Sequence, residues 1–217
     1  MVLFNGRPLA IPQLQTKAAA ILEACFPGTQ GANGVADILF GLVEPSGRLT
    51  TTFPRNVGQV PFHYNHFNTG RPGVGDYHGN YVDVPTSPEY PFGFGLAYTT
   101  FEFSQVTLAT NAISLHGKIS ASVEIKNTGA RAGTAVAELY LRALAATAGP
   151  RPVRELKGFQ KILLQPGETQ TAKFELTAKE LGYFDAKGNW LVEPGKYQIW
   201  ISADAASGEP AVFQLKR

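Results

Sequence analysis

The sequence lacks several features that would narrow its function at once. Cys25 is the only cysteine in 217 residues, so no disulfide can form within the chain. The net charge is only +2 and no Lys/Arg cluster stands out, which argues against nucleic-acid binding. No apolar run approaches bilayer-spanning length and residues 1–25 show no signal-peptide pattern, so we predict no membrane partner. The cellular compartment stays unknown.

Common catalytic signatures are also missing. No G-x-S-x-G nucleophile elbow occurs, and the glycine-rich stretch 28–34 lacks the spacing of a dinucleotide-binding loop. Acids of the first 90 residues are scattered, and nothing in the sequence pairs two of them across one bond. His63 and His66 are three residues apart within a loop, where spacing says little about metal geometry. We therefore predict no catalytic residue, no metal site and no cofactor.

The first part of the chain has the pattern of an α/β layer. Residues 2–4 are apolar, and the second apolar run, 18–26, stops at Pro27-Gly28, which favours a buried strand. That position predicts a buried, unreactive thiol for Cys25. Helical spacing of apolar residues predicts a helix over 32–42, and 48–53 is rich in β-formers.

A long irregular segment, 54–90, follows this layer. It is rich in proline and glycine and holds three of the four histidines. A loop of this length within a compact domain usually carries function or covers a surface.

From residue 101 onward the hydrophobic period is two, as in β-strands. Turn signals such as Gln-Pro-Gly-Glu at 165–168 separate the runs. The predicted strands are 106–108, 119–125, 136–141, 159–164, 171–176, 197–201 and 211–215. Around seven short strands are typical of an immunoglobulin-like or fibronectin-type sandwich. Trp190 and Trp200 are expected in its core or at a sheet edge.

The stretch 90–103, YPFGFGLAYTTFEF, joins the two parts. Its aromatics favour a packed joint over a sugar-binding platform. Gly93 and Gly95 would let two backbones approach closely there.

Several motifs in this order resemble glycoside hydrolase family 3, above all its bacterial, often periplasmic, β-glucosidases. They are AILEACFPGTQG (20–31), ADILFG (36–41), PSGRLT (45–50), TFPR (52–55), YNHFNTGRP (64–72), YPFGFGLAYTTF (90–101), KNTGARAG (126–133), VRELKGF (153–159) and LQPGE (164–168). The resemblance covers essentially the whole chain.

The resemblance implies a mostly β, α+β fold. Residues 1–95 would be the end of the family's flavodoxin-like α/β sandwich, including the loop 54–90, and 96–217 a fibronectin type III-like domain. Family members hydrolyse terminal β-D-glucosyl residues with retention, using a carboxylate nucleophile and a second carboxyl group. The segments that carry both groups in the family have no counterpart in these 217 residues. The chain thus resembles the last third of such an enzyme, and we expect it to be inactive alone.

By the same resemblance, His66, Asn68 and Arg71 would line the outer, leaving-group side of the sugar pocket. An α/β layer without its flanking strands leaves apolar faces and sheet edges uncovered. We therefore expect a partner: a chain carrying the barrel of the family, a second copy, or the sandwich domain itself. Two other functions remain open, a carbohydrate-binding or protein-interaction module, and a hydrolase with a repurposed site in the loop 62–78.

Overall fold

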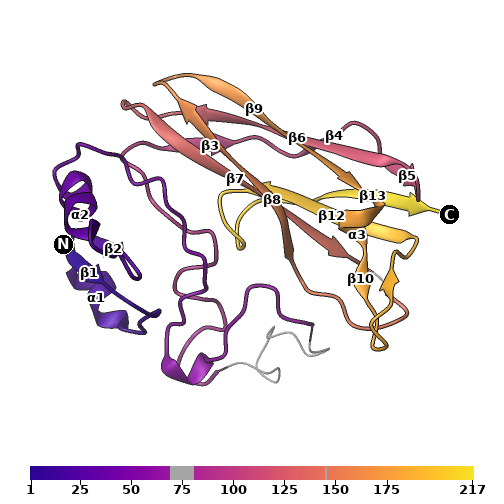
Figure 1. Cartoon of the computed structure of the whole chain (residues 1–217), viewed down its shortest axis with the longest axis horizontal. Helices are drawn as coiled ribbons and strands as arrows, with labels where there is room; N and C mark the ends of the chain where they lie inside the picture. Colours follow the sequence, from indigo (N-terminus) through magenta and orange to yellow (C-terminus); the bar gives the residue numbers. More distant parts are fainter. Residues whose placement is uncertain (69–80, 145) are drawn as a thin grey trace.

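The computed structural model describes residues 1–68, 81–144 and 146–217, and its architecture is dominated by strands (Figure 1). A β-sandwich makes up the second half, while a small α/β unit lies at one end and loops run beside the sandwich. The elements in chain order are β1 (Val2–Phe4), α1 (Pro12–Lys17), β2 (Ile21–Glu23), α2 (Gly31–Leu39), the 3-10 turn η1 (Val57–Gln59), β3 (Phe101–Phe103), β4 (Thr107–Leu108), β5 (Ala112–Ser114), β6 (Lys118–Asn127), β7 (Gly133–Ala143), β8 (Glu155–Leu164), β9 (Thr169–Thr177), α3 (Ala178–Leu181), β10 (Tyr183–Phe184), β11 (Trp190–Leu191), β12 (Gly195–Ser202) and β13 (Ala211–Lys216).

Two sheets face each other in the sandwich. One has the strand order β5-β13-β12-β7-β8, and in the other β6 pairs with β3, β4 and β9. Alternate residues of β6 are buried, as expected for a strand with one face on the core. The core between the sheets includes Ile119, Leu139 and Phe213, each at most 1% exposed. The predicted sandwich is therefore confirmed, and the turn at 165–168 connects β8 to β9 with Gly167 at a φ of 78°.

The α/β unit is smaller than the sequence pattern indicates. Strands β1 and β2 pair in parallel, but β2 covers only part of the predicted 18–26. The predicted helix is confirmed as α2, shifted to Gly31–Leu39. Residues 48–53 form no strand, because Phe53 makes only a single bridge, to Tyr90.

The prediction of a buried Cys25 is wrong. Cys25 is exposed and has a φ of 49°, in the left-handed region, so the chain turns immediately after β2. The Cys25 N–H donates to the Glu23 carboxylate at 2.6 Å, which closes this turn. Apolar neighbours in sequence did not bury the thiol because the strand ends before it.

The aromatic joint brings backbones into contact, as its glycines predict. A Cβ at Gly95 would lie 2.8 Å from the carbonyl oxygen of Gly47, and a Cβ at Gly93 would overlap the Glu138 carboxylate. The loops on either side pack on the sandwich, where Tyr64 stacks on Phe92 at 4.3 Å and meets Tyr140 edge-on at 5.8 Å. This packing places the segment before the joint against the outer face of the five-stranded sheet.

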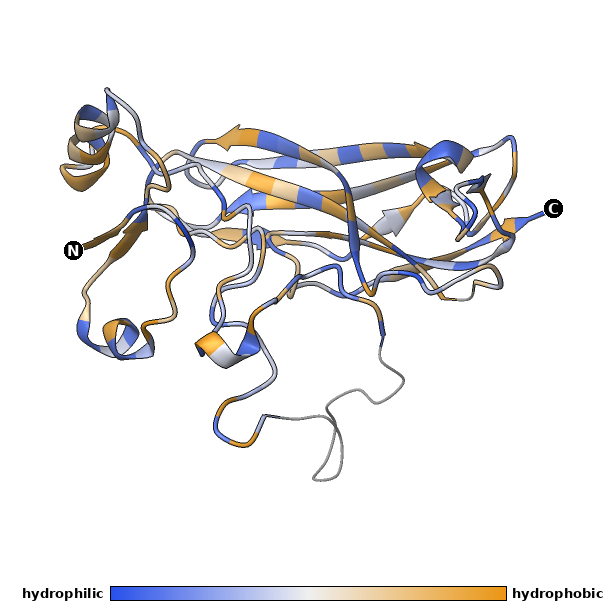
Figure 2. Ribbon diagram, turned by 60° about the horizontal axis from the view of Figure 1, so that its bottom comes forward, coloured by the Kyte–Doolittle hydropathy of each residue, from blue (hydrophilic) through white to orange (hydrophobic). Residues whose placement is uncertain are grey.

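Trp200 is 6% exposed on β12, whereas Trp190 is 46% exposed in the short hairpin β10–β11. The hydropathy colouring shows apolar residues along the strands of the sandwich and also on the small α/β unit (Figure 2). In that unit the apolar side chains face outward: Phe26 is 87% exposed, and Phe40 and Leu42 are each 76% exposed.

Candidate functional site

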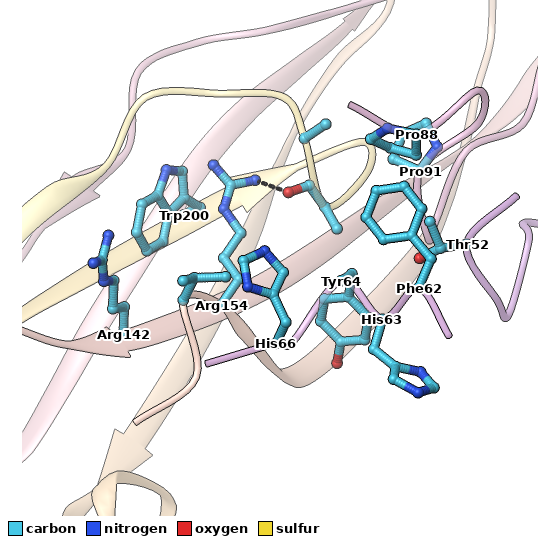
Figure 3. Close-up of a pocket in the computed structure, with 13 residues that line it drawn as sticks. Thr52, Phe62, His63, Tyr64, His66, Pro88, Pro91, Arg142, Arg154 and Trp200 are labelled. Atoms are coloured by element: carbon cyan, nitrogen blue, oxygen red, sulfur yellow. Dashed lines mark hydrogen bonds between the residues drawn. The ribbon is translucent and has the colours of Figure 1, made fainter. Parts of the chain in front are cut away.

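A hollow lies between the outer face of the five-stranded sheet and the loops that cover it. Its volume is about 330 Å³, the lower end of the range for small-molecule sites. Figure 3 shows the residues around it. They are Thr52, Phe62, His63, Tyr64, His66, Pro88, Pro91, Arg142, Val153, Arg154, Trp200, Ala205 and Ala206.

Strand alternation explains why the sheet contributes polar side chains here. Leu139 and Leu141 of β7 point into the core, so Tyr140 and Arg142 point to the opposite face. On β12, Trp200 is the cross-strand partner of Tyr140. The sheet therefore presents two aromatic rings and a guanidinium to the covering loops.

Arg154 forms a second wall of the hollow. Its guanidinium lies 4.4 Å from the centre of the Trp200 ring and 5.8 Å from that of Tyr140, distances typical of cation–π contacts. Its Nη1 donates to the carbonyl oxygens of Ala205 at 2.5 Å and Ser207 at 3.0 Å. Burial lowers the pKa of Arg154, although a guanidinium stays protonated in proteins. These contacts fix the cation in place.

A buried acid lies beneath the hollow. The Tyr140 hydroxyl donates to the Glu138 carboxylate, and both residues are at most 5% exposed. Burial raises the pKa of Glu138, and the hydrogen bond from Tyr140 opposes this rise; Asp204 raises it further and Arg48 lowers it. The pKa of Tyr140 is also raised, by burial and by the bond to Glu138. Glu138 is enclosed by the joint and does not line the hollow.

The loop at the rim is tied to the sandwich by its backbone. The carbonyl oxygen of His66 accepts from the Val153 N–H at 3.0 Å, and Phe67 bridges to Pro152. The Tyr64 hydroxyl accepts from the Leu156 N–H at 3.2 Å. These three contacts hold residues 64–67 against the segment before β8 and the start of that strand.

The predicted site residues have different outcomes. His66 lines the hollow, with Nδ1 3.0 Å from the carbonyl oxygen of Phe67. Asn68 is exposed just beyond it, and Arg71 lies outside the described residues. The imidazole of His63 points away from Arg154 and Trp200 (Figure 3). The sugar-pocket role of His66, Asn68 and Arg71 stays a prediction.

Sequence reasoning missed Arg142, Arg154 and Trp200. The alternation in β7 already placed Arg142 on the face opposite the core, and this signal was available. No local pattern, however, links these residues to a loop more than 70 positions away. Only the tertiary packing joins them.

None of the described residues that line the hollow is a carboxylate. A retaining glycosidase needs two carboxyl groups about 5 Å apart, and these described residues do not supply them. Within the described ranges, no group of three or more His, Cys, Asp or Glu is arranged to hold a metal ion. Nor does any described helix have the length and hydropathy to cross a membrane.

Two family models match the chain. Residues 1–98 match the glycosyl hydrolase family 3 C-terminal domain, and residues 135–205 match a fibronectin type III-like domain. These matches follow the order of the α/β unit and the sandwich in the structure.

The relatives align with nearly all of this chain, but the aligned region is only part of each relative's own length. A periplasmic β-glucosidase of Salmonella typhimurium is 45% identical over 99% of the chain, and a β-xylosidase of Formosa agariphila is 40% identical over 99%. The chain spans 28% and 29% of these two proteins.

Solved structures show the same relation. A β-glucosidase from Erythrobacter marinus superposes with a TM-score of 0.91 at 43% identity, over 99% of this chain and 28% of that one. A Listeria innocua β-glucosidase in complex with isofagomine gives 0.91 at 35% identity, over 98% and 30%. The chain corresponds to the C-terminal portion of these enzymes, the end of the α/β domain followed by the fibronectin III-like domain. It therefore belongs to glycoside hydrolase family 3.

Proposed function

We propose that this chain is the C-terminal part of a retaining β-glucosidase that hydrolyses terminal non-reducing β-D-glucosyl residues, and that it is inactive on its own. The observation that carries this proposal is the 45% identity over 99% of the chain to a β-glucosidase of which it spans 28%. The lack of a carboxylate among the described residues around the hollow supports inactivity.

The exposed apolar side chains of the α/β unit support a partner. Phe26, Phe40 and Leu42 are the most exposed of them, and burying such side chains contributes roughly 1.5–3 kcal/mol each. The pairing of β1 with β2 alone leaves sheet edges without hydrogen-bonding partners among the described strands. We propose that a chain carrying the barrel and the first part of the α/β sandwich covers this surface.

His66 and Asn68 are proposed to face the leaving-group side of the sugar in that assembly, together with Arg71. The support is their place at the rim of the hollow and on the exposed loop beside it. Imidazole, amide and guanidinium groups suit directional hydrogen bonds to sugar hydroxyls.

The test is hydrolysis of an aryl β-D-glucoside, next to an aryl ester, by the purified chain. We expect no turnover of either substrate alone, and glucoside turnover when a chain carrying the family's barrel is added. Glucoside turnover by this chain alone would overturn the proposal. Ester turnover alone, lost in His63→Ala or His66→Ala, would instead indicate a repurposed hydrolase site in the loop 62–78.

A binding assay separates the remaining alternative. A carbohydrate-binding module would retain oligosaccharides without turnover, with or without the added chain. In the reconstituted enzyme, Asn68→Ala should raise KM for aryl glucosides more than Asn5→Ala, a matched change in the α/β unit. Equal KM values for the two variants would contradict the proposed role of Asn68.

A further inference from the structure

The loop that is proposed to face the leaving group leaves and returns through one stem, which we define as residues 53–59 and 83–90. At the base of the stem Phe53 and Tyr90 form a β-bridge, in which the Phe53 N–H donates to the Tyr90 carbonyl oxygen at 2.9 Å. The Glu89 N–H donates to the Phe53 carbonyl oxygen, also at 2.9 Å. Because these bonds join the two limbs of the stem, the loop between them starts and ends at one place.

Arg55 joins the two limbs of the stem through its guanidinium. Its Nη1 lies 2.7 Å from Oε2 of Glu89, and its Nε donates to the carbonyl oxygen of Ser87 at 3.2 Å. The side chains of Arg55 and Glu89 are only 30% and 12% exposed. A guanidinium with several directional contacts, paired with a largely buried carboxylate, is held more firmly than a surface ion pair.

Gln59 is a second tie in the stem, and it is 3% exposed. Its Oε1 accepts from the N–H groups of Arg55 at 2.6 Å and Asn56 at 3.2 Å, within its own limb. Its Nε2 donates to the Pro85 carbonyl oxygen at 2.9 Å, in the other limb. Both polar ends of one buried amide are thus used, and removing it would take a partner from partly buried backbone groups of both limbs.

The stem lies next to the residues that are proposed to meet the sugar. Phe62, which follows Gln59 closely in the chain, and Pro88 of the returning limb line the same hollow as His66 (Figure 3). Further along, the loop is tied to the sandwich, because the His66 carbonyl oxygen accepts from the Val153 N–H at 3.0 Å. The stem therefore sets the position of the limb that leads to His66. A displacement of about 1 Å in a group that positions a substrate can lower activity about a hundredfold.

We propose that Arg55, Gln59 and Glu89 are positioning residues, which hold His66 and Asn68 where the leaving group of the substrate binds. These three residues act through the loop and do not contact the sugar. The inference rests on the proposed function and adds to it the residues on which leaving-group recognition depends. Stem variants should therefore impair hydrolysis only of substrates whose leaving group is large enough to reach the loop.

The experiment compares two substrates of the enzyme reconstituted with a chain that carries the family's barrel. The leaving group of an aryl β-D-glucoside is a whole ring, whereas that of β-D-glucosyl fluoride is a single atom. We expect Arg55→Gln and Gln59→Leu each to raise KM for the aryl glucoside at least about fivefold, and to change kcat and both constants for the fluoride less than about twofold. Arg55→Lys, which keeps the charge, should have a smaller effect than Arg55→Gln. Glu175→Gln, in an exposed ion pair of the sandwich, is the control and should change neither substrate's constants.

A double variant shows whether the stem acts through the loop. Adding Gln59→Leu to Asn68→Ala should raise KM by a smaller factor than Gln59→Leu does alone, because the contact that the stem positions is already lost. Additive increases, or an unchanged KM in a folded Gln59→Leu variant, would overturn the inference. An equal loss on both substrates, the result of a stem that only supports the fold, would overturn it as well. No aryl glucoside turnover by the reconstituted parent would overturn the proposed function, and this inference with it.

Discussion

The two ends of this molecule bury their apolar residues to very different extents. The sandwich encloses a continuous core in which Ile119, Ile125 and Leu139 are fully buried. In residues 1–43, Phe4 is the only buried residue, although this segment is also rich in apolar side chains. The difference supports our proposal that a further chain covers the α/β unit, whereas the sandwich encloses its own core.

The largest expected difference is in the free energy of unfolding lost when a core leucine or a surface leucine is replaced by alanine. Leu139→Ala empties a position that is fully buried and should lower the free energy of unfolding by about 3–5 kcal/mol. Leu42→Ala removes the same atoms from a side chain that is 76% exposed, and it should change the free energy of unfolding by less than about 0.5 kcal/mol. Urea denaturation followed by far-UV circular dichroism, which reports on both regions, measures both, and a comparable loss in the two variants would break the comparison.

The joint between the two regions should tolerate change less than an ordinary turn. Gly93 and Gly188 both have φ near 80°, so replacement by alanine costs about 1–2 kcal/mol at each position. Only at Gly93 would the added Cβ meet the Glu138 carboxylate; at Gly188 it meets open space. We expect Gly93→Ala to cost at least about 1 kcal/mol more than Gly188→Ala in the same denaturation assay. Equal costs would contradict the close packing of the joint.

The free energy of unfolding should depend on pH through Glu138, which lies where the sandwich meets the joint. Its pKa is raised in the folded chain, so the folded state binds more protons than the unfolded state above the ordinary pKa of a carboxyl group. Stability is therefore lost as the pH rises through the folded pKa, by about 1.4 kcal/mol for each unit of pKa difference. Glu138→Gln cannot titrate, so its stability relative to the parent chain should increase from pH 4 to pH 8. A constant or opposite difference in urea melts across this range would contradict the direction of the shift.

Ion pairs should contribute least, and an exposed pair should contribute less than a largely buried one. The Lys118–Glu175 pair spans 3.3 Å with both side chains more than half exposed, and Glu175→Gln should cost less than about 0.5 kcal/mol. Glu89 is 12% exposed and bonds Arg55 at 2.7 Å, so Glu89→Gln should cost more than Glu175→Gln. Thermal melts of the two variants provide the measurement, and a larger loss for Glu175→Gln would reverse this ranking.

The sequence predicts the sandwich well because period-two alternation in β6, β7 and β12 corresponds directly to one buried face. The α/β unit is predicted less accurately. The run 18–26 has the composition of a long buried strand, but such a strand forms only where neighbouring strands cover it. In this chain β2 pairs with β1 alone and ends at Glu23, which leaves Cys25 exposed.

The candidate site was also predicted from the sequence only in part. His66 and Asn68 came from a motif resemblance, and His66 does line the hollow. Arg142, Arg154 and Trp200 come from separate strands and from the segment before β8, and their meeting with the loop 62–66 depends on long-range packing. Alternation predicts which way each side chain faces, but not which loop covers it.

Native-state hydrogen exchange of the isolated chain tests the central claim most directly, because it reports the stability of both regions in one sample. The account predicts that amides of β6, β7 and β12 exchange only through global unfolding. Amides of β1, β2 and α2 should exchange through local opening of much lower free energy. Equal protection of the two regions in a monomeric chain would contradict the claim that the α/β unit is an incomplete layer awaiting its partner.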